Sequence, residues 1–289
     1  MLGRNFRKHL TLKPLRLQHD SPTEFIVSQW QHDKSKINLK YCVYRVSIFI
    51  IFFVSWIFTY LKEPPIGKPR WPIYLTNWGF TLIMLQNLLN SIMLIVSLIS
   101  EKVINKSDLK EKIVRIYPVY WAFNIISTPV AFTISIIYWT LIFGAEGATF
   151  TAMNFIVHGL NSIITIIDLC VVCHPIKIFH FIYPLLFALS YTIFTIIFYI
   201  AGGTTKTGSR YIYPILKWDQ PGKTTGICAG VMGLMIVLHL FTFGIYRARI
   251  KLFDRFVRPR IKESVISNGE EHDSPHSFYN KAMAISEYI

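Results

Sequence analysis

Residues 153–173 read MNFIVHGLNSIITIIDLCVVC. This stretch is long and apolar enough to cross a bilayer as a helix, since a span needs about 20 mostly apolar residues. Its polar members recur at steps of three, four and three, and they fall within roughly 80° on one side of a helix. They are His158, Asn161, Thr165 and Asp168. A membrane helix with such a polar stripe is expected to face a partner and not lipid.

Five further apolar stretches accompany this one and set the class of the protein. Of the 289 residues, 52% are apolar and 16% are charged, and the mean hydropathy is +0.40. Because a helix satisfies its own backbone hydrogen bonds in hydrocarbon, we predict an all-α membrane protein, a bundle of six transmembrane helices. The helices are expected at 42–61, 73–100, 118–144, 153–173, 179–201 and 226–246. Residues 1–41 are expected to form a basic cytosolic N-terminal arm, and residues 247–289 a cytosolic tail whose distal part is expected to be disordered.

The distribution of Lys and Arg predicts the orientation of the bundle. Nine of these residues lie in the arm up to Arg45, five follow the second helix, one follows the fourth and eight lie in the tail. The alternate loops hold three, none and four. By the positive-inside rule, both termini are therefore expected in the cytosol. The glycosylation sequon at Asn105 then lies on the cytosolic side.

The net charge of +14 could suggest nucleic acid, but the placement of the cations favours lipid. Seven of them follow directly on the last predicted helix and are interleaved with apolar residues. They are Arg247, Arg249, Lys251, Arg255, Arg258, Arg260 and Lys262. This pattern is typical of a juxtamembrane segment that binds anionic lipid at the cytosolic face, and it is equally the ordinary bias of a cytosolic tail. No nucleic-acid partner is expected.

The second predicted helix also has a polar face. Gln86, Asn87 and Asn90 lie on it, and the amides must bond to other helices or to water. Each amide taken alone is expected to form a hydrogen bond that joins two helices. The two polar stripes on the second and fourth helices, if they face each other, favour a cavity between these helices. Asp168 is the one carboxylate well inside a predicted span, so it is expected to be paired, with His174 and Lys177 nearest in sequence. Either a structural or a functional role fits it.

Thr76 and His158 are expected at similar depth, near the outer ends of their helices. A hydroxyl and an imidazole at one level can act as nucleophile and general base in acyl transfer. The simpler interpretation is that His158 makes a hydrogen bond between helices. The choice depends on whether the two side chains meet.

Cysteine spacing offers a second chemistry, which we set aside. Cys170, Cys173 and His174 match the spacing that attaches c-type haem, but they sit at the cytosolic end of a predicted membrane helix. The four cysteines all lie in or beside spans, so no disulfide framework is expected. We predict no metal site and no cofactor.

Three segments resemble the rolling stone family of multi-pass membrane proteins. They are Tyr74-Leu75-Thr76-Asn77-Trp78-Gly79, His158-Gly159-Leu160-Asn161-Ser162 followed by Asp168, and Tyr211-Ile212-Tyr213-Pro214-Ile215-Leu216-Lys217-Trp218-Asp219. The resemblance covers roughly residues 25–250. It implies a role in membrane or cell-cell processes such as myoblast fusion, at the plasma membrane and with other membrane proteins as possible partners.

The same segments are distantly similar to androgen-induced membrane hydrolases, which cleave fatty acid esters of hydroxy fatty acids. Thr76 falls on the catalytic threonine of those enzymes. Their catalytic histidine falls on Asn161, and His158 falls on the histidine that precedes it. An amide cannot act as a general base, so the resemblance implies hydrolysis only if His158 has taken that role.

Two functions are therefore open, a non-enzymatic role in cell-cell processes and an intramembrane lipid-ester hydrolase. For the first, the contact surface is expected on the loop between the fifth and sixth helices. Its candidate residues are Tyr211, Tyr213, Lys217 and Trp218. The same aromatic residues would also serve as an interfacial belt that anchors the helix ends. A transporter that uses Asp168 is a third hypothesis, and no pair of broken helices supports it.

Overall fold

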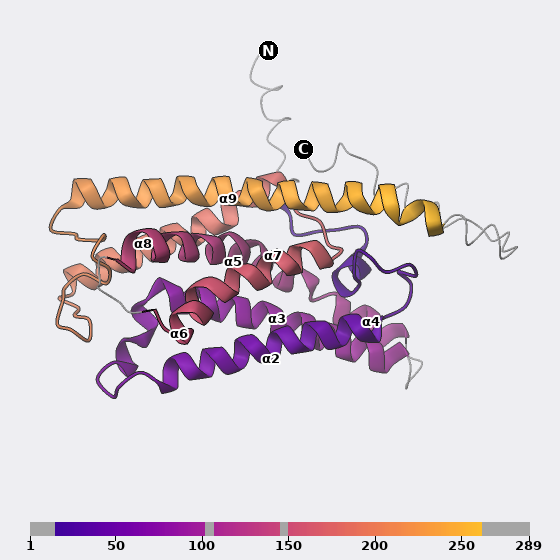
Figure 1. Cartoon of the computed structure of the whole chain (residues 1–289), viewed down its shortest axis with the longest axis horizontal. Helices are drawn as coiled ribbons and strands as arrows, with labels where there is room; N and C mark the ends of the chain where they lie inside the picture. Colours follow the sequence, from indigo (N-terminus) through magenta and orange to yellow (C-terminus); the bar gives the residue numbers. More distant parts are fainter. Residues whose placement is uncertain (1–14, 102–106, 145–149, 262–289) are drawn as a thin grey trace, which may run out of the picture.

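A computed structural model of the chain describes residues 15–101, 107–144 and 150–261. Most of these residues are helical, and the strand pairing among them is one antiparallel bridge between Ser28 and Val172. Six helical segments are long and apolar enough to cross a membrane, as the sequence predicts. Figure 1 shows them packed lengthwise against one another.

The spans have the following bounds. They are α2 (Leu39–Leu61), α3 (Leu75–Ile99), α5 (Tyr117–Ile137) continued by η5 (Tyr138–Ile142), the run of α6 (Ala152–Phe155), η6 (Ile156–Leu160) and α7 (Asn161–Val171), α8 (Ile182–Ile200), and α9 (Pro221–Phe256). Shorter helices are η2 (Pro22–Ile26), η3 (Lys68–Ile73), α4 (Ser107–Val114) and η7 (Ile178–Phe181). Both η5 and η6 are π-helical turns.

Helix α5 lies at the centre of the bundle. Its side chains belong to each of four apolar clusters, and Trp121, Val130 and Ala131 are fully buried. Helix α3 packs closely on it at Gly79, where a Cβ atom would lie 2.6 Å from the Cδ1 of Ile134. A small residue at this point lets the two backbones approach, as is common between membrane helices.

The outer faces of the bundle are apolar and exposed. Ile51 and Phe58 on α2, Ile197 on α8, and Val237 and Phe241 on α9 are among the exposed large side chains. In a soluble protein such faces would be unstable, but in a bilayer they meet lipid tails. The exposed surface therefore agrees with a membrane-spanning bundle.

Residues 15–38, here called the N-terminal strap, lie within the predicted basic N-terminal arm and pack against the bundle. Phe25 and Ile26 are fully buried, and the Asn90 amide donates to the Phe25 carbonyl at 2.8 Å. The Trp30 indole donates to the Cys170 carbonyl at 2.7 Å. The strap thus closes one end of the bundle, and its apolar run Phe25–Val27 is the reason, because burial removes it from water.

Helix α9 is longer than the predicted span of 226–246. It begins at Pro221, which suits the first turn of a helix, and runs without a break to Phe256. Its 36 residues measure about 54 Å, against roughly 30 Å of hydrocarbon. The additional turns remain helical because Arg249 and Phe253 are buried against the rest of the protein. The rings of Phe253 and Trp30 lie 6.4 Å apart, so the strap and the end of α9 meet.

Candidate functional site

A buried ion pair joins the first and fourth spans at the end closed by the strap. Arg45 of α2 is fully buried, and its Nη1 donates to Oδ1 of Asp168 on α7. The Tyr44 hydroxyl donates to the same oxygen at 3.2 Å. The expected partners of Asp168 were wrong, since the Lys177 ammonium donates to carbonyls of the strap and His174 bonds to the Tyr120 hydroxyl.

The polar face of α3 is directed into the protein. Gln86, Asn87 and Asn90 are all buried. Asn124 of α5 donates to the Gln86 amide oxygen at 2.7 Å, and Nη2 of Arg45 donates to the Asn87 amide oxygen at 3.2 Å. Arg45 therefore bridges the polar faces of α3 and α7. These side chains join helices, and the cavity described below lies elsewhere.

The polar stripe of the fourth span is interrupted. Asn161, Thr165 and Asp168 are buried, whereas His158 is only half-buried and Val157 is buried beside it. The π-helical turn η6 contains His158 and ends just before Asn161. A π-turn has more residues per turn than an α-helix, so the even step of 100° fails across it. This is why His158 departs from the predicted stripe.

Thr76, His158 and Asn161 have different neighbours in the structure. The His158 ring stacks on the Tyr138 ring with 3.5 Å between centroids. The Asn161 amide oxygen accepts from the Ser135 hydroxyl at 3.2 Å. Thr76, in contrast, lines a cavity whose wall includes neither His158 nor Asn161.

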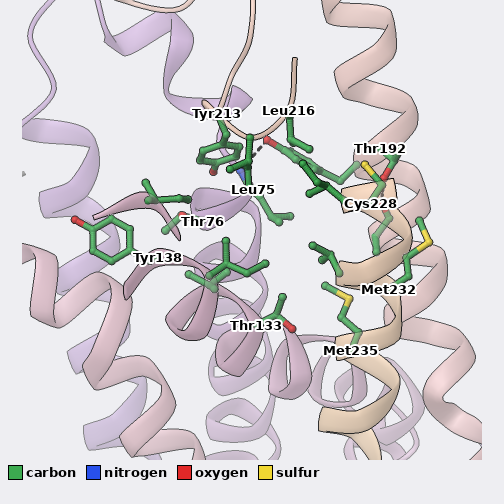
Figure 2. Close-up of a pocket in the computed structure, with 18 residues that line it drawn as sticks. Leu75, Thr76, Thr133, Tyr138, Thr192, Tyr213, Leu216, Cys228, Met232 and Met235 are labelled. Carbon is green, nitrogen blue, oxygen red and sulfur yellow. Dashed lines mark hydrogen bonds between the residues drawn. The ribbon is translucent and has the colours of Figure 1, made fainter. Parts of the chain in front are cut away.

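This cavity has a volume of about 70 Å³ and lies between the start of α3, the end of α5, α8 and the start of α9. Figure 2 shows Thr76 and Tyr213 at one end, Thr133 and Met235 at the other, and Cys228 on the wall. Most of the lining is aliphatic, with hydroxyls and one thiol as the polar groups. Such a space between helices is a usual form of a small-molecule site.

Two tyrosines complete the start of α3 at the rim of the cavity. The helix has no capping side chain of its own, so its first amides need other acceptors. The Tyr191 hydroxyl accepts from the Leu75 amide at 3.1 Å and donates to the Ile73 carbonyl at 2.8 Å. Burial raises the pKa of the Tyr213 hydroxyl to about 12, although its interactions with Thr76 and Leu75 oppose the shift.

The four residues predicted for outer-loop contact have different environments. Tyr213 faces the cavity, and the Trp218 indole donates to the Thr195 hydroxyl at 3.1 Å. The Lys217 ammonium lies over the Tyr211 ring, 4.8 Å from its centroid. All four residues are half-buried, and Tyr211 and Lys217 contact each other.

The basic residues near the end of α9 have different environments. Arg249 is buried, and its guanidinium donates to the carbonyls of Leu169 at 2.7 Å and His174 at 2.9 Å. Its assignment to lipid is thus corrected, because its N–H groups donate to carbonyls in the last turn of α7 and in the segment that follows α7. Arg247, Lys251 and Arg255 lie within about 80° on another side of the helix. Arg258 and Arg260 follow them, and Lys262 lies outside the described residues.

Within the described ranges no group of His, Cys, Asp and Glu side chains could hold a metal ion. The four cysteines are free thiols. Cys173 is buried, and burial raises its pKa, while Cys170 is exposed.

The similarity to known proteins extends over nearly the whole chain. A family model described as "Protein rolling stone" matches residues 2–262. The chain belongs to the rolling stone family. A family member from Drosophila melanogaster, "Protein rolling stone", is 29% identical over 258 residues, which cover 87% of this chain and 92% of that protein. No solved structure matches the chain.

Several residues of this rolling stone family member escaped the sequence reasoning. Arg45 lies three residues inside the first predicted span, but the count of Lys and Arg assigns it to the cytosolic arm. Arg249 sits one turn after Tyr246, at the spacing of a shared buried face. Tyr138 and Tyr191 carry no local signal, because their roles depend on which helices are neighbours.

Proposed function

We propose that this protein acts at the plasma membrane in membrane or cell-cell processes such as myoblast fusion, with other membrane proteins as partners. The observation that carries the proposal is the match to the Drosophila relative over 92% of that protein's length. Similarity over the whole bundle, in contrast to a single shared motif, supports a shared cellular role.

Rescue of fusion tests this proposal. Drosophila myoblasts that lack rolling stone would express this chain, with its surface level measured by an epitope tag. We expect the number of nuclei per myotube to recover. A chain that reaches the plasma membrane at the level of the Drosophila protein without any recovery would contradict the proposal.

The pair Tyr211 and Lys217 is the proposed contact surface on the outer loop. We expect the double substitution Tyr211→Ala and Lys217→Ala to lower rescue while the surface level stays unchanged. Lys62→Ala is the matched control, because Lys62 is an exposed cation elsewhere in the outer loops. If both variants rescue equally well, this surface is not the contact site.

One observation favours a second function, the hydrolysis of a lipid ester: Thr76 lines an apolar cavity of the bundle. Against it, His158 stacks on Tyr138 and does not reach the lining, and Asn161 bonds to Ser135. The cavity provides a hydroxyl, but the described wall holds no imidazole to act as its base. The geometry supports binding in this cavity better than hydrolysis.

An activity probe for serine hydrolases separates the two functions. If the protein is an esterase, the probe should label the purified protein. The substitutions Thr76→Ala and His158→Ala should each abolish this labelling. A folded, monodisperse sample that stays unlabelled counts against hydrolysis. Labelling that persists in Thr76→Ala would assign the reaction to another nucleophile.

A further inference from the structure

The cavity has two hydroxyl groups at one end, and the rest of its wall is mostly apolar, with the hydroxyls of Thr133 and Thr192 among the aliphatic side chains. Thr76 and Tyr213 lie at one end, and Met232 and Met235 lie toward the other (Figure 2). The lining residues carry no charged side chain. A charged group that moves from water into such a space loses its hydration without gaining an ionic partner, so a charged head group is disfavoured there.

The hydroxyls of the wall are already donors to the protein, which limits what they offer a ligand. Thr133 donates to the Pro129 carbonyl at 2.8 Å, and Thr192 donates to the Ala188 carbonyl at 2.9 Å. Each hydroxyl oxygen keeps a lone pair that can accept a hydrogen bond. A ligand that carries hydroxyl groups complements this wall.

The cavity also reaches the surface of the bundle. Thr192 on α8 and Cys228, Val231 and Met232 on α9 line it, and all four are half-buried. A volume of about 70 Å³ corresponds to roughly five water-sized spheres, enough for a head group or a few methylenes. A longer chain would continue between these helices into the bilayer. The unbranched, flexible side chains of Met232 and Met235 can adjust to it.

We infer that this cavity binds a neutral single-chain lipid, such as a monoacylglycerol or a long-chain alcohol. The hydroxyl head group lies against Thr76 and Tyr213, and the chain runs along α9 past Val231. Binding requires no reaction at Thr76, and it does not rest on the proposed role in fusion.

Alkylation of Cys228 tests the inference on the unaltered protein. The full chain in lipid nanodiscs is treated with a membrane-permeable maleimide, and mass spectrometry follows Cys228 and Cys170. Cys170 is exposed on the fourth span, away from the cavity, and is an internal control. We expect a monoacylglycerol to slow alkylation of Cys228 and leave that of Cys170 unchanged. Equal slowing of both, or of neither, overturns the inference.

The head group is tested with lysophosphatidic acid of the same acyl chain, which differs from the monoacylglycerol by one phosphate. Because the cavity wall has no cation, we expect about tenfold more of the charged lipid to be needed for equal protection of Cys228. If the phosphate-bearing lipid protects equally well or better, the assignment to a neutral head group fails.

A matched pair of variants locates the site. A photoreactive, alkyne-tagged monoacylglycerol is cross-linked to Val231→Trp, which fills the cavity, and to Val237→Trp, which adds the same ring on the exposed face of α9. We expect labelling to fall about tenfold in Val231→Trp and to stay at the wild-type level in Val237→Trp. Equal labelling of both variants, each checked as folded by size exclusion, would show annular lipid only. The Cys228 measurement decides the question if Val231→Trp does not fold.

Discussion

Arg45 and Arg249 are the two largest charged side chains buried in the bundle, and they are satisfied in different ways. Arg45 has a carboxylate partner in Asp168, while Arg249 bonds to backbone carbonyls at the end of α7. A charge in hydrocarbon is costly unless it is paired. Each arginine therefore holds a particular helix in place, and their removal has distinct consequences.

The ion pair predicts a strong non-additive effect on stability. Arg45→Met leaves Asp168 as an unpaired buried charge, and Asp168→Leu does the same to Arg45, so each should destabilise the protein by about 3–5 kcal/mol. The double variant replaces the pair with apolar side chains and should recover most of this loss. Unfolding in detergent micelles measures all three. A double variant as unstable as the sum of the single variants would contradict the pairing.

We expect Arg249 to contribute to stability and Arg247 to contribute to lipid binding. Arg249→Ala should lower the unfolding free energy by about 1–3 kcal/mol, because buried carbonyls of α7 lose their donors. Arg247→Ala should leave stability unchanged and weaken binding to vesicles with anionic lipid by about 1 kcal/mol. Thermal unfolding and vesicle flotation measure the two effects. The assignment fails if Arg249→Ala only weakens vesicle binding.

At the scale of elements, the strap packs against several helices of the bundle. It bonds to the end of α7 through the Gln29 amide, which donates to the Val171 carbonyl at 2.9 Å. It also contacts α3 through Asn90 and α9 through Trp30. A segment with so many partners behaves as a seventh element of the bundle, which the hydropathy of the spans does not reveal.

Glu24 in the strap predicts how docking of this segment depends on pH. Burial raises its pKa above the usual 4.5, although His19, Lys34 and Arg249 oppose the shift. Glu24 therefore binds its proton more tightly in the folded state than in the unfolded state. Its contribution to the free energy of unfolding is fully present below about pH 4.5 and is lost as the pH rises through the raised pKa. Glu24→Gln should therefore strengthen docking at neutral pH and flatten its pH dependence.

Hydrogen exchange of residues 22–30 measures this docking in the wild type and the variant. Glu63→Gln is the control, because Glu63 pairs with Lys206 in the loops at the other end of the bundle. Weaker protection of the strap in Glu24→Gln at neutral pH would mean that its charged pairs outweigh its burial.

At the scale of the molecule, the charge distribution predicts that both termini face the cytosol. Epitope tags at either terminus should be detected only after cells are permeabilised, and a tag inserted after Thr207 should be detected on intact cells. Asn105, outside the described residues, should remain unglycosylated. Surface staining of a terminal tag on intact cells would reverse the orientation of the bundle.

The sequence sufficed for the number of spans and most of their bounds, because apolar length is a local property that the bilayer imposes. Helix α9 extends past residue 246 because Arg249 and Phe253 bury its last turns against the rest of the protein, and these contacts come from distant parts of the chain. The buried amides of α3 were also predictable from their spacing. Their partners were not, because a polar stripe does not specify which helix lies opposite.

The candidate site was predicted only in part. Thr76 does line a cavity, but the expected histidine partner is not among its lining residues; His158 stacks on Tyr138. Tyr191 and Tyr213, which complete the start of α3, come from distant parts of the chain. No pattern within one helix predicts such contacts.

The pair of Arg45 and Asp168 also bears on how the molecule is made. Arg45 lies on α2, which leaves the ribosome before α7, and its partner is synthesised 123 residues later. At about 5–20 residues per second, the guanidinium waits roughly 6–25 s for its carboxylate. An arginine in a lone span opposes insertion, by about 2.5–3.5 kcal/mol at the centre of the helix and by less near its end, where Arg45 lies. In nascent chains that end before Asp168, Arg45 therefore has no ion-pair partner in the membrane. This unpaired cation distinguishes incomplete chains from complete ones.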